Sequence, residues 1–427
     1  MEKFDVAIVG GGILGVTISY WLSELSDCSI ALIDKENEVA FHTSSRNTGM
    51  VHRPFYLNPE KKKIFAKASQ KSYFMWKDLA QRDNLTWKQL GTLEVATNED
   101  QVKTLDQYKK WALQNGMTEE EVKVLSSEEV SKIEPKVKCS GAIHSKTDTC
   151  VNYKELTNVI FQKALKNGVK FLHGKVNKPK EDENQVSITF QDRELDAGFL
   201  INAAGGSSID IAHDLFLAKE YTDLHFRGEY WRVEEPFASK ISRNIYSVAK
   251  YKEFPFLDPH FIVRANGTRE IGPNAVLVSG PGAYKGLSEK KSQVISKIFE
   301  RPLGPKLKLF TSKTFLSLVW HEWRSSISKS AMCARVKEFI PSIDSSLIKE
   351  RGLAGVRASV IDGNGFVPEA VLLSGKRSLH IVNYNSPGAT GAPAFSAYVV
   401  SRLVNQGYVR KVEKDGLFWN YEDASDL

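Results

Sequence analysis

The stretch Asp5-Val-Ala-Ile-Val-Gly-Gly-Gly-Ile-Leu-Gly15 decides the fold and lies almost at the start of the 427-residue chain. Residues 6–9 are apolar and predict a buried strand. Gly10, Gly12 and Gly15 follow with the spacing Gly-x-Gly-x-x-Gly, directly before an apolar segment, residues 16–25, that predicts a helix. A strand, a glycine-rich turn and a helix in this order indicate the first unit of a Rossmann-like dinucleotide-binding fold.

Each part of this motif has a physical role toward a pyrophosphate. Gly10 permits the tight turn, Gly12 lets the pyrophosphate approach the backbone, and Gly15 lets the helix and strand pack closely. Ile13 and Leu14 lie between the glycines, directly before the predicted helix, whose N-terminus supplies amide donors and a positive dipole end for the phosphates. We therefore expect these five residues to bind the cofactor.

A second apolar strand is predicted at residues 29–33, and it ends at Asp34 and Lys35. Asp34 follows Gly15 by 19 positions, where a carboxylate can hold a ribose hydroxyl. The complete order of strand, glycines, helix, strand and acid favours a bound dinucleotide over a fortuitous glycine turn.

The composition is that of an ordinary globular protein, with 42% hydrophobic and 26% charged residues. The chain is too long for one small core, so two interwoven domains are expected. No apolar run approaches the roughly 20 residues that span a bilayer, and the start lacks the features of a signal peptide. Cys28, Cys139, Cys150 and Cys333 form no Cys-x-x-Cys pair. These features predict a cytoplasmic protein without disulfides or a metal site.

The net charge of +7 is a mild basic excess, and the basic residues are scattered along the chain. Scattered charge favours a solvated surface over a dedicated nucleic-acid face, so no nucleic-acid partner is expected. Residues 60–80 contain an amphipathic helix candidate that is expected to pack on the protein. Membrane association is therefore expected to be peripheral at most.

Three later segments favour FAD over a nicotinamide cofactor. Residues 43–49 are rich in hydroxyl and amide groups, residues 202–205 end an apolar strand with small residues, and residues 386–391 form a glycine-containing turn before a helix. Contact from both ends of the chain suits the longer FAD, and a helix N-terminus can stabilise charge on a reduced flavin. The further residues expected to bind a non-covalent FAD are Thr43, Ser44, Ser45, Asn47, Thr48, Gly49, Val176, Ala203, Ala204, Gly205, Gly388, Ala389, Thr390 and Gly391.

The chain resembles the D-amino-acid-oxidase-like superfamily of FAD-dependent oxidoreductases over nearly its whole length. Within it, the chain is most similar to the L-2-hydroxyglutarate dehydrogenase/oxidase family. The segments that carry the resemblance are His42-x-x-x-x-Asn47-x-Gly49-x-Val51-His52, Gly91-Thr-Leu-Glu-Val-Ala-Thr97, Phe226-Arg-Gly-Glu-Tyr230, Gly272-Pro-Asn-Ala-Val-Leu277 and Gly355-Val-Arg357. Arg53-Pro54 departs from the small pair usual in the family, so the resemblance supports the reaction class more strongly than the substrate.

The expected fold is α/β with an α+β second domain. A Rossmann-like FAD-binding domain would comprise residues 1–90, 141–206 and 346–427. An interwoven antiparallel β-sheet domain for the substrate would comprise residues 91–140 and 207–345, because its second segment is rich in aromatic residues and short β-like runs.

Oxidation of a hydroxy acid requires a base and a cation for the carboxylate. His52 is the candidate base because imidazole accepts a proton near neutral pH, with a structural histidine as the alternative. Arg357 and Arg227 are the candidate carboxylate ligands, since a guanidinium binds carboxylate bidentately. The resemblance supports Arg357, whereas Glu229 could bind Arg227 in a structural ion pair. Tyr230 and His260 are expected in the core of the sheet domain.

The resemblance implies oxidation of a small 2-hydroxy (di)carboxylate, best L-2-hydroxyglutarate to 2-oxoglutarate, with hydride transfer to flavin N5. Oxygen, a quinone or an electron-transfer protein would then reoxidise the flavin. The same scaffold suits glycerol 3-phosphate, malate or a secondary amine such as sarcosine. An RNA-directed flavoprotein and a flavoprotein without turnover are alternatives of other classes. A cation-rich substrate pocket would favour the dicarboxylate, and a cation-poor one the amine.

Overall fold

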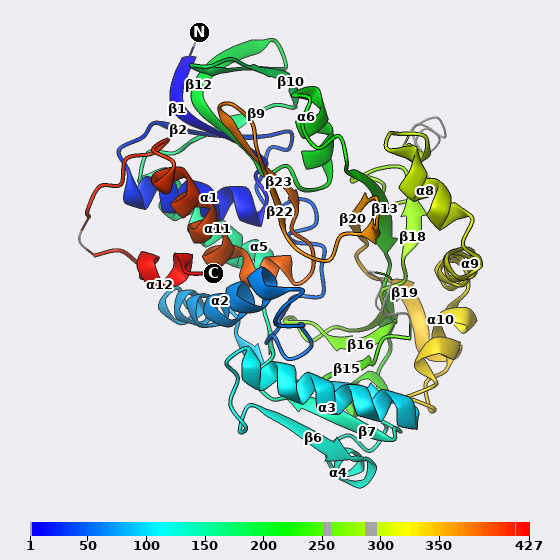
Figure 1. The fold of residues 1–427 in the computed structure, drawn as a ribbon. Coiled ribbons are helices and arrows are strands. Elements are labelled where there is room, and N and C mark those ends of the chain that lie inside the picture. The colour runs from blue at the N-terminus through cyan, green and yellow to red at the C-terminus, as the bar shows by residue number, and fades with distance from the viewer. Residues whose placement is uncertain (1, 251–253, 255–257, 287–296, 415) are drawn as a thin grey trace.

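The computed structural model describes residues 2–250, 254, 258–286, 297–414 and 416–427 (Figure 1). The glycine-rich stretch joins strand β1 (Glu2–Val9) to helix α1 (Ile13–Leu25), and β2 (Ile30–Asp34) lies parallel to β1. The order in this sheet is β10-β11-β12-β1-β2-β9, with β23 pairing beside β12 and β22 beside β23. The remaining strands are β9 (Lys170–His173), β10 (Val176–Glu181), β11 (Val186–Phe190), β12 (Arg193–Asn202), β22 (Val371–Ser374) and β23 (Ser378–Asn383).

Successive side chains along β1 point to opposite faces of this sheet, and helices cover both faces. Val6 and Ile8 of β1 belong to a core cluster shared with helices of one face, and Ala7 and Val9 belong to a cluster that includes Ile211 of the helix α6 on the other. Figure 1 shows α1, α5, α11 and α2 together on the first face. The helices of this part are α1, α2 (Lys63–Arg82), α5 (Tyr153–Lys166), α6 (Ser208–Asp214), α11 (Gly388–Asn405) and α12 (Tyr421–Ser425). The buried face of α2 includes Phe65 and Trp76, so the amphipathic segment at 60–80 packs on the protein as expected.

The second part of the structure is built on mainly antiparallel sheets. Its larger sheet has the order β19-β14-β17-β16-β15-β5-β7-β6, in which only the β15–β5 pairing among the described residues is parallel. Its strands are β5 (Thr92–Ala96), β6 (Val122–Ser126), β7 (Gly141–Ser145), β14 (Trp231–Val233), β15 (Asn244–Ser247), β16 (His260–Val263), β17 (Arg269–Gly272) and β19 (Ile348–Arg351). A smaller sheet has the order β18-β13-β20-β21, with β13 (Thr222–Gly228), β18 (Val276–Val278), β20 (Gly355–Asp362) and β21 (Gly365–Phe366). The expected α/β fold with a Rossmann-like sheet and antiparallel sheets is therefore confirmed.

A three-stranded sheet, two helices and three short turns add to these elements. Strands β3 (Met50–Val51), β8 (Thr149–Cys150) and β4 (Lys88–Gln89) pair in that order. Helices α3 (Glu99–Gln114) and α4 (Ser127–Ile133) pack on β6 and β7. Short 3₁₀ turns lie at Gly205–Ser207, Ala238–Lys240 and Ser345–Leu347. Within the described chain, no helix is long and apolar enough to cross a bilayer.

Residues 303–336 differ from the expectation for residues 220–330. The helices α8 (Leu303–Phe310), α9 (Lys313–Ile327) and α10 (Lys329–Val336) occupy the end of this region in place of strands. Phe315 and Leu318 on α9 bury one face of that helix against the β13 and β20 sheet. The interpretation from aromatic content failed here because buried aromatic residues suit either a strand or a helix that packs on a sheet.

The division into two domains stays a prediction, and sheet pairing departs from the predicted bounds at two places. Strand β7 falls in the segment 141–206 but pairs with β5 and β6. Strands β19 and β20 fall in the segment 346–427 but pair with β14 and β13. The chain thus crosses between the parts at residues that sequence patterns alone do not mark.

Glu94 on β5 gives a prediction about stability and pH. Burial, together with the nearby charge of Asp148, raises the pKa of the Glu94 carboxyl to about 8. An unfolded glutamate has a pKa of about 4.3, so the folded state binds the extra proton and loses stability as pH rises from about 4.3 to about 8. Replacing Glu94 with Gln should therefore raise the free energy of unfolding by at most about 4 kcal/mol at about pH 7, and by little at about pH 4.

Urea unfolding of both proteins at the two pH values measures this difference. Glu60→Gln, at an exposed position, is the matched control and should leave the unfolding free energy nearly unchanged. An equal effect of Glu94→Gln at both pH values would show that ionisation is not its cause.

Candidate functional site

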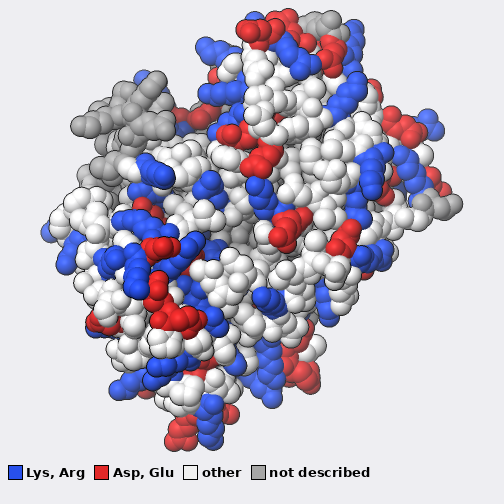
Figure 2. All heavy atoms as spheres, turned by 180° about the vertical axis from the view of Figure 1, so that it is seen from behind, with Lys and Arg blue, Asp and Glu red and all other residues white. Residues whose placement is uncertain are grey.

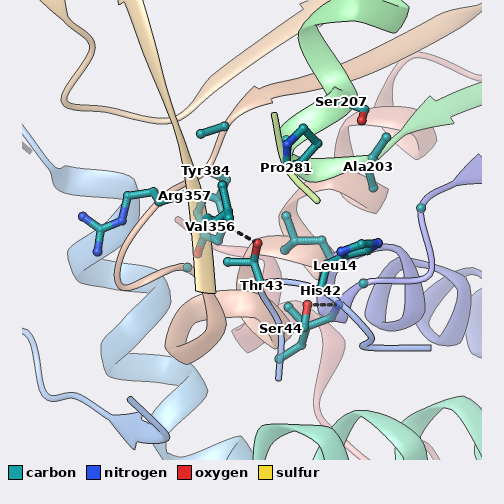
Figure 3. A pocket seen from close by; sticks show the side chains of 18 of the residues that line it. Leu14, His42, Thr43, Ser44, Ala203, Ser207, Pro281, Val356, Arg357 and Tyr384 are labelled. Atoms are coloured by element: carbon teal, nitrogen blue, oxygen red, sulfur yellow. Dashed lines mark hydrogen bonds between the residues drawn. The ribbon is translucent and has the colours of Figure 1, made fainter. Parts of the chain in front are cut away.

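A cavity of about 1020 Å³ lies between the two parts of the structure. It is formed by the β1–α1 turn, the carboxyl ends of β2 and β12, the segment 41–52, and the start of α11, and it extends to β16 and β20 (Figure 3). The carboxyl ends of parallel strands are the usual binding edge of an open α/β sheet. The predicted cofactor residues that line it are Gly10, Gly12, Ile13, Leu14, Asp34, Lys35, Thr43, Ser44, Asn47, Thr48, Val176, Ala203, Ala204, Gly205, Gly388, Ala389 and Thr390.

Four predicted cofactor residues do not line this cavity, and the structure gives each a different role. A Cβ on Gly15 would lie 1.8 Å from the Gly10 carbonyl oxygen, so Gly15 allows close packing of helix and turn, as predicted. Gly49 has a φ of +74° in a turn, and Gly391 lies against Tyr384. The Ser45 hydroxyl donates to backbone oxygens of its own loop. These four residues therefore affect the conformation of the segments that line the cavity, without lining it themselves.

The glycine turn is held close to the end of β12. Gly10 has a φ of +112°, and a Cβ there would lie 2.4 Å from the Ala203 carbonyl oxygen. The Ser44 hydroxyl accepts a hydrogen bond of 2.9 Å from the amide of Ile13, as drawn in Figure 3. The segment 43–49 is therefore fastened to the N-terminus of α1, at the place where a pyrophosphate is expected.

Asp34 closes the same edge of the cavity. Its Oδ2 accepts from the Gly11 amide at 2.5 Å, and its Oδ1 accepts from the Glu36 amide at 2.7 Å. Each oxygen keeps further acceptor capacity, so the carboxylate can also accept from a ribose hydroxyl.

The N-terminus of α11 forms the opposite wall. The helix begins at Gly388, within the predicted turn at residues 386–391, and its first residues line the cavity. The indole nitrogen of Trp76 donates to the Thr390 carbonyl at 2.8 Å, and the Thr390 hydroxyl accepts from the His52 amide at 3.2 Å. Dinucleotide contacts at both chain ends, the feature that favoured FAD in the sequence, are thus available in one cavity.

His52 lines the cavity and is held by a buried carboxylate. Its Nδ1 lies 2.9 Å from Asp148 Oδ2, and its side chain is 13% exposed. Asp148 is fully buried and also accepts from the Arg53 amide, the Thr92 hydroxyl and the Ser145 hydroxyl. Because an ionised carboxylate only accepts, Nδ1 carries the proton of the neutral ring, and Nε2 keeps its lone pair.

Arg357 marks another region of the cavity. In Figure 3 its guanidinium extends from β20 away from Leu14 and His42. Burial lowers the pKa of Arg357, and partial burial, with a smaller contribution from the charge of Arg357, lowers the pKa of Lys62. The positive charge of Arg357 in the cavity wall favours an anionic ligand at this end.

Tyr246 and His260 line the cavity in the same region, with rings stacked at 3.8 Å between centroids. Both residues are more than nine-tenths buried, and neither the Tyr246 hydroxyl nor either ring nitrogen of His260 has a hydrogen-bond partner among the described residues. Burial lowers the pKa of His260 well below its usual range and raises that of Tyr246, so both are neutral near pH 7. His260 and Tyr230 are buried, as expected, and both also line the cavity; Tyr230 packs in a cluster with Tyr246 and Ile262.

Arg227 does not line the cavity. Its guanidinium forms an ion pair of 2.9 Å with Glu229 and donates to the carbonyls of Ala283 and Gly286. The structural alternative considered for Arg227 is the one observed, so it has no place in the site proposed below. Arg53 is also buried and paired, with Glu121 at 2.5 Å.

Several lining residues were missed from the sequence. Some of them lie beside a predicted cofactor segment, and a longer segment would have included them. Others lie on strands that are distant in sequence, and no pattern near them indicates that they reach the cavity. The missed residues include Gly11, Phe41, His42, Arg46, Tyr153, Tyr246, Pro281, Val356 and Tyr384. Within the described ranges, no three His, Cys, Asp or Glu side chains are grouped so as to hold a metal ion.

Gly10 supplies a test of the cofactor cradle. In Gly10→Ala, the new methyl group would meet the Ala203 carbonyl, and the φ of +112° would be strained. Strain of about 1–3 kcal/mol in this turn should weaken FAD binding by roughly 5- to 150-fold, as measured by flavin absorbance of the protein at increasing FAD concentration. Gly363→Ala is the control, since nothing lies within 4 Å of its Cβ position. Full occupancy in Gly10→Ala would contradict the assignment.

The comparisons with known proteins agree with this geometry. The family described as FAD dependent oxidoreductase (DAO) matches residues 5–402. An L-2-hydroxyglutarate dehydrogenase from Indibacter alkaliphilus is 32% identical over 397 residues, which cover 91% of this chain and 96% of that protein. The mitochondrial L-2-hydroxyglutarate dehydrogenase of Homo sapiens is 28% identical, covering 94% of this chain and 89% of its own.

Solved structures with low sequence identity share the fold. Dithionite-reduced L-alpha-glycerophosphate oxidase from Mycoplasma pneumoniae, with FAD bound, has a TM-score of 0.75 at 21% identity and covers 97% of each chain. Glycine oxidase from Geobacillus kaustophilus has a TM-score of 0.67 at 16% identity and covers 95% of each chain. At these identities the likeness establishes the fold and leaves the substrate open.

Proposed function

Because the chain belongs to the FAD dependent oxidoreductase (DAO) family, we propose that it oxidises a small 2-hydroxy carboxylate, with L-2-hydroxyglutarate as the best candidate. FAD dependence and oxidoreduction follow from the family, and the choice of substrate is the proposal. The curated relatives named L-2-hydroxyglutarate dehydrogenase support it, since their matches cover most of both chains.

The observation that carries the proposal is the His52–Asp148 pair in the same cavity as Arg357. FAD, when bound, supplies the acceptor for the hydride that leaves the substrate carbon. His52 Nε2 accepts the hydroxyl proton, and Asp148 stabilises the imidazolium that forms. Arg357 binds the carboxylate next to the reacting carbon.

The remaining polar groups favour an anionic substrate over an amine. Arg357 supplies a cation, and Tyr246 and His260 offer unpartnered polar atoms to further substrate oxygens. A substrate with two carboxylates would use more of these groups than sarcosine would. L-Malate and glycerol 3-phosphate present related charge and are the competing substrates.

An anaerobic reduction panel tests the proposal. The FAD-loaded protein is mixed separately with L-2-hydroxyglutarate, L-malate, glycerol 3-phosphate and sarcosine, and the flavin absorbance and the product are followed. Rapid bleaching with formation of 2-oxoglutarate is expected for the first compound. Bleaching by glycerol 3-phosphate or sarcosine alone would replace the proposed substrate class, and bleaching by none would leave an FAD protein with another role.

The net charge of +7 gives the RNA-directed alternative little support. On the face in Figure 2, Lys and Arg are interspersed with Asp and Glu. Binding of tRNA that falls steeply with salt would nevertheless favour that alternative. We further propose that oxygen, a quinone or an electron-transfer protein reoxidises the flavin. Turnover measured with each of these acceptors would distinguish them.

A further inference from the structure

Residues 91–97 do not line the cavity, although they carry part of the family resemblance. They contain β5 (Thr92–Ala96), which pairs with β7 (Gly141–Ser145) so that Thr92 lies opposite Ser145. Thr92 is 1% exposed, and Ser145 is fully buried. Because neither residue lines the cavity, any effect of these two residues on the reaction has to pass through another residue.

Both hydroxyls donate to the carboxylate of Asp148. The Thr92 hydroxyl donates to Oδ2 at 2.9 Å, and the Ser145 hydroxyl donates to Oδ1 at 2.6 Å. The same Oδ2 lies 2.9 Å from His52 Nδ1, and the same Oδ1 accepts from the Arg53 amide at 3.0 Å. An ionised carboxylate has about four acceptor sites, two on each oxygen, so these donors fill them. The buried carboxylate is therefore held in one orientation by partners on both oxygens.

The turn before β5 holds the backbone of Asp148 as well. The Gly91 amide donates to the Asp148 carbonyl oxygen at 3.0 Å. Gly91 has a φ of +75°, and a Cβ there would lie 3.0 Å from His144 Nε2 and 3.1 Å from the Ser145 carbonyl oxygen. A side chain at position 91 would therefore be both strained and crowded. Gly91 and Thr92 thus fix the main chain and the side chain of Asp148, the partner of His52.

We propose that Thr92 and Ser145 are positioning residues for His52. Their hydroxyls hold the Asp148 carboxylate in the orientation that accepts from His52 Nδ1. This orientation keeps the proton of the neutral ring on Nδ1 and leaves the Nε2 lone pair available to the substrate. Without the two hydroxyls, a buried anion would lack half of its donors, which is costly, and the carboxylate would turn toward other donors. The inference rests on the proposed function, in which His52 is the base.

Flavin reduction in variants that lack one hydroxyl tests this role. Thr92→Val keeps the shape of the side chain and removes its hydroxyl, and Ser145→Ala removes the second hydroxyl. Each should lower the limiting rate of anaerobic reduction by L-2-hydroxyglutarate about tenfold, the effect expected when a hydrogen bond to a charged group is lost. Substrate affinity and FAD content should change little, because neither residue lines the cavity. Thr92→Ser retains a hydroxyl and should restore most of the rate.

Thr157→Val is the matched control. Thr157 is also fully buried, and its hydroxyl donates to the Tyr153 carbonyl oxygen at 2.7 Å. The substitution removes the hydroxyl of a buried threonine that has no contact with Asp148, so the reduction rate should stay within about threefold of the original. An equal loss of rate in Thr157→Val and Thr92→Val would overturn the proposal. A full rate in both Thr92→Val and Ser145→Ala would overturn it as well.

Nitrogen NMR of histidine-labelled protein tests the positioning of His52 without a substrate. At a pH where the ring is neutral, the nitrogen chemical shifts show which ring nitrogen carries the proton, and the absence of signals in His52→Gln identifies those of His52. The unchanged protein should carry this proton on Nδ1, whereas Thr92→Val/Ser145→Ala should show a mixture of the two forms. Flavin absorbance confirms that each variant is folded, and the single variants provide the same comparison if the double variant does not fold.

The two measurements separate this proposal from the proposed function. An unchanged Nδ1 form of His52 in the variants would overturn the positioning role, even if their reduction rates fall. If no compound of the reduction panel bleaches the flavin, the proposed function fails, and the NMR result alone decides whether the two hydroxyls position His52.

Discussion

Replacement of His52 by Gln should slow anaerobic reduction of the bound FAD by about 10²–10⁴-fold, the usual contribution of a general base. The substituted side chain has no basic lone pair that can take the hydroxyl proton. FAD content should be unchanged, because the His52 backbone amide, which donates to Thr390, is retained. Stopped-flow absorbance at saturating substrate measures the rate, and a titration of that rate gives the substrate affinity, which should change little.

Asp148→Asn tests the positioning of His52 separately from its presence. The Asp148 Oδ1 accepts from the Arg53 amide and the Ser145 hydroxyl, so an asparagine would keep its oxygen there and turn its amide nitrogen toward His52. That amide donates to Nδ1, which places the imidazole proton on Nε2 and removes the lone pair that faces the cavity. A loss close to that of His52→Gln, in a protein that still contains histidine, would distinguish proton transfer from a packing role.

His213→Gln is the control for these two variants. Its ring bonds the backbone oxygens of Ala218 and Tyr221 and does not line the cavity. The flavin reduction rate should remain within about threefold of the original, as expected for a residue outside the site. A rate retained to the same degree in His52→Gln would exclude His52 as the base.

The parts of the site that could be predicted from sequence are those whose residues lie close together along the chain. Gly10 and Gly15 are required by atoms a few residues away or on the adjoining strand, and both constraints are seen in the structure. Asp34 is predictable for the same reason, since it ends the strand next to β1. The start of α11 is predictable in the same way, from the glycine-containing turn at residues 386–391 that precedes a helix.

The parts that could not be predicted depend on pairing between distant segments. Asp148 follows His52 by 96 positions, and nothing near it in the sequence distinguishes it from other acidic residues. The choice between Arg357 and Arg227 is similar, because both lie on neighbouring strands of one sheet. The two arginines differ in that Arg227 is paired with Glu229 and that their side chains point in different directions. Both differences are properties of the folded structure.

Replacement of Arg357 by Met should weaken binding of a 2-hydroxy carboxylate by about 30- to 5000-fold, corresponding to the roughly 2–5 kcal/mol lost when a buried charged hydrogen-bond partner is removed. Water solvates the charge of Arg357 poorly at this position, and this lowers its pKa. A bound carboxylate therefore supplies a charged hydrogen-bond partner that little water can replace. The dissociation constant follows from the reduction rate against substrate concentration, and independently from flavin absorbance during titration with 2-oxoglutarate.

Two further variants determine whether the Arg357 effect arises from carboxylate binding. Arg357→Lys keeps the charge but loses the bidentate fork, so it should retain part of the affinity, and guanidinium ion should partly restore Arg357→Ala. Arg227→Met removes the buried ion pair with Glu229, so it should lower stability while the folded protein keeps its substrate affinity. A loss of affinity in Arg227→Met equal to that in Arg357→Met would mean that the carboxylate site extends beyond the cavity described above, and that the ion pair opens to admit the substrate.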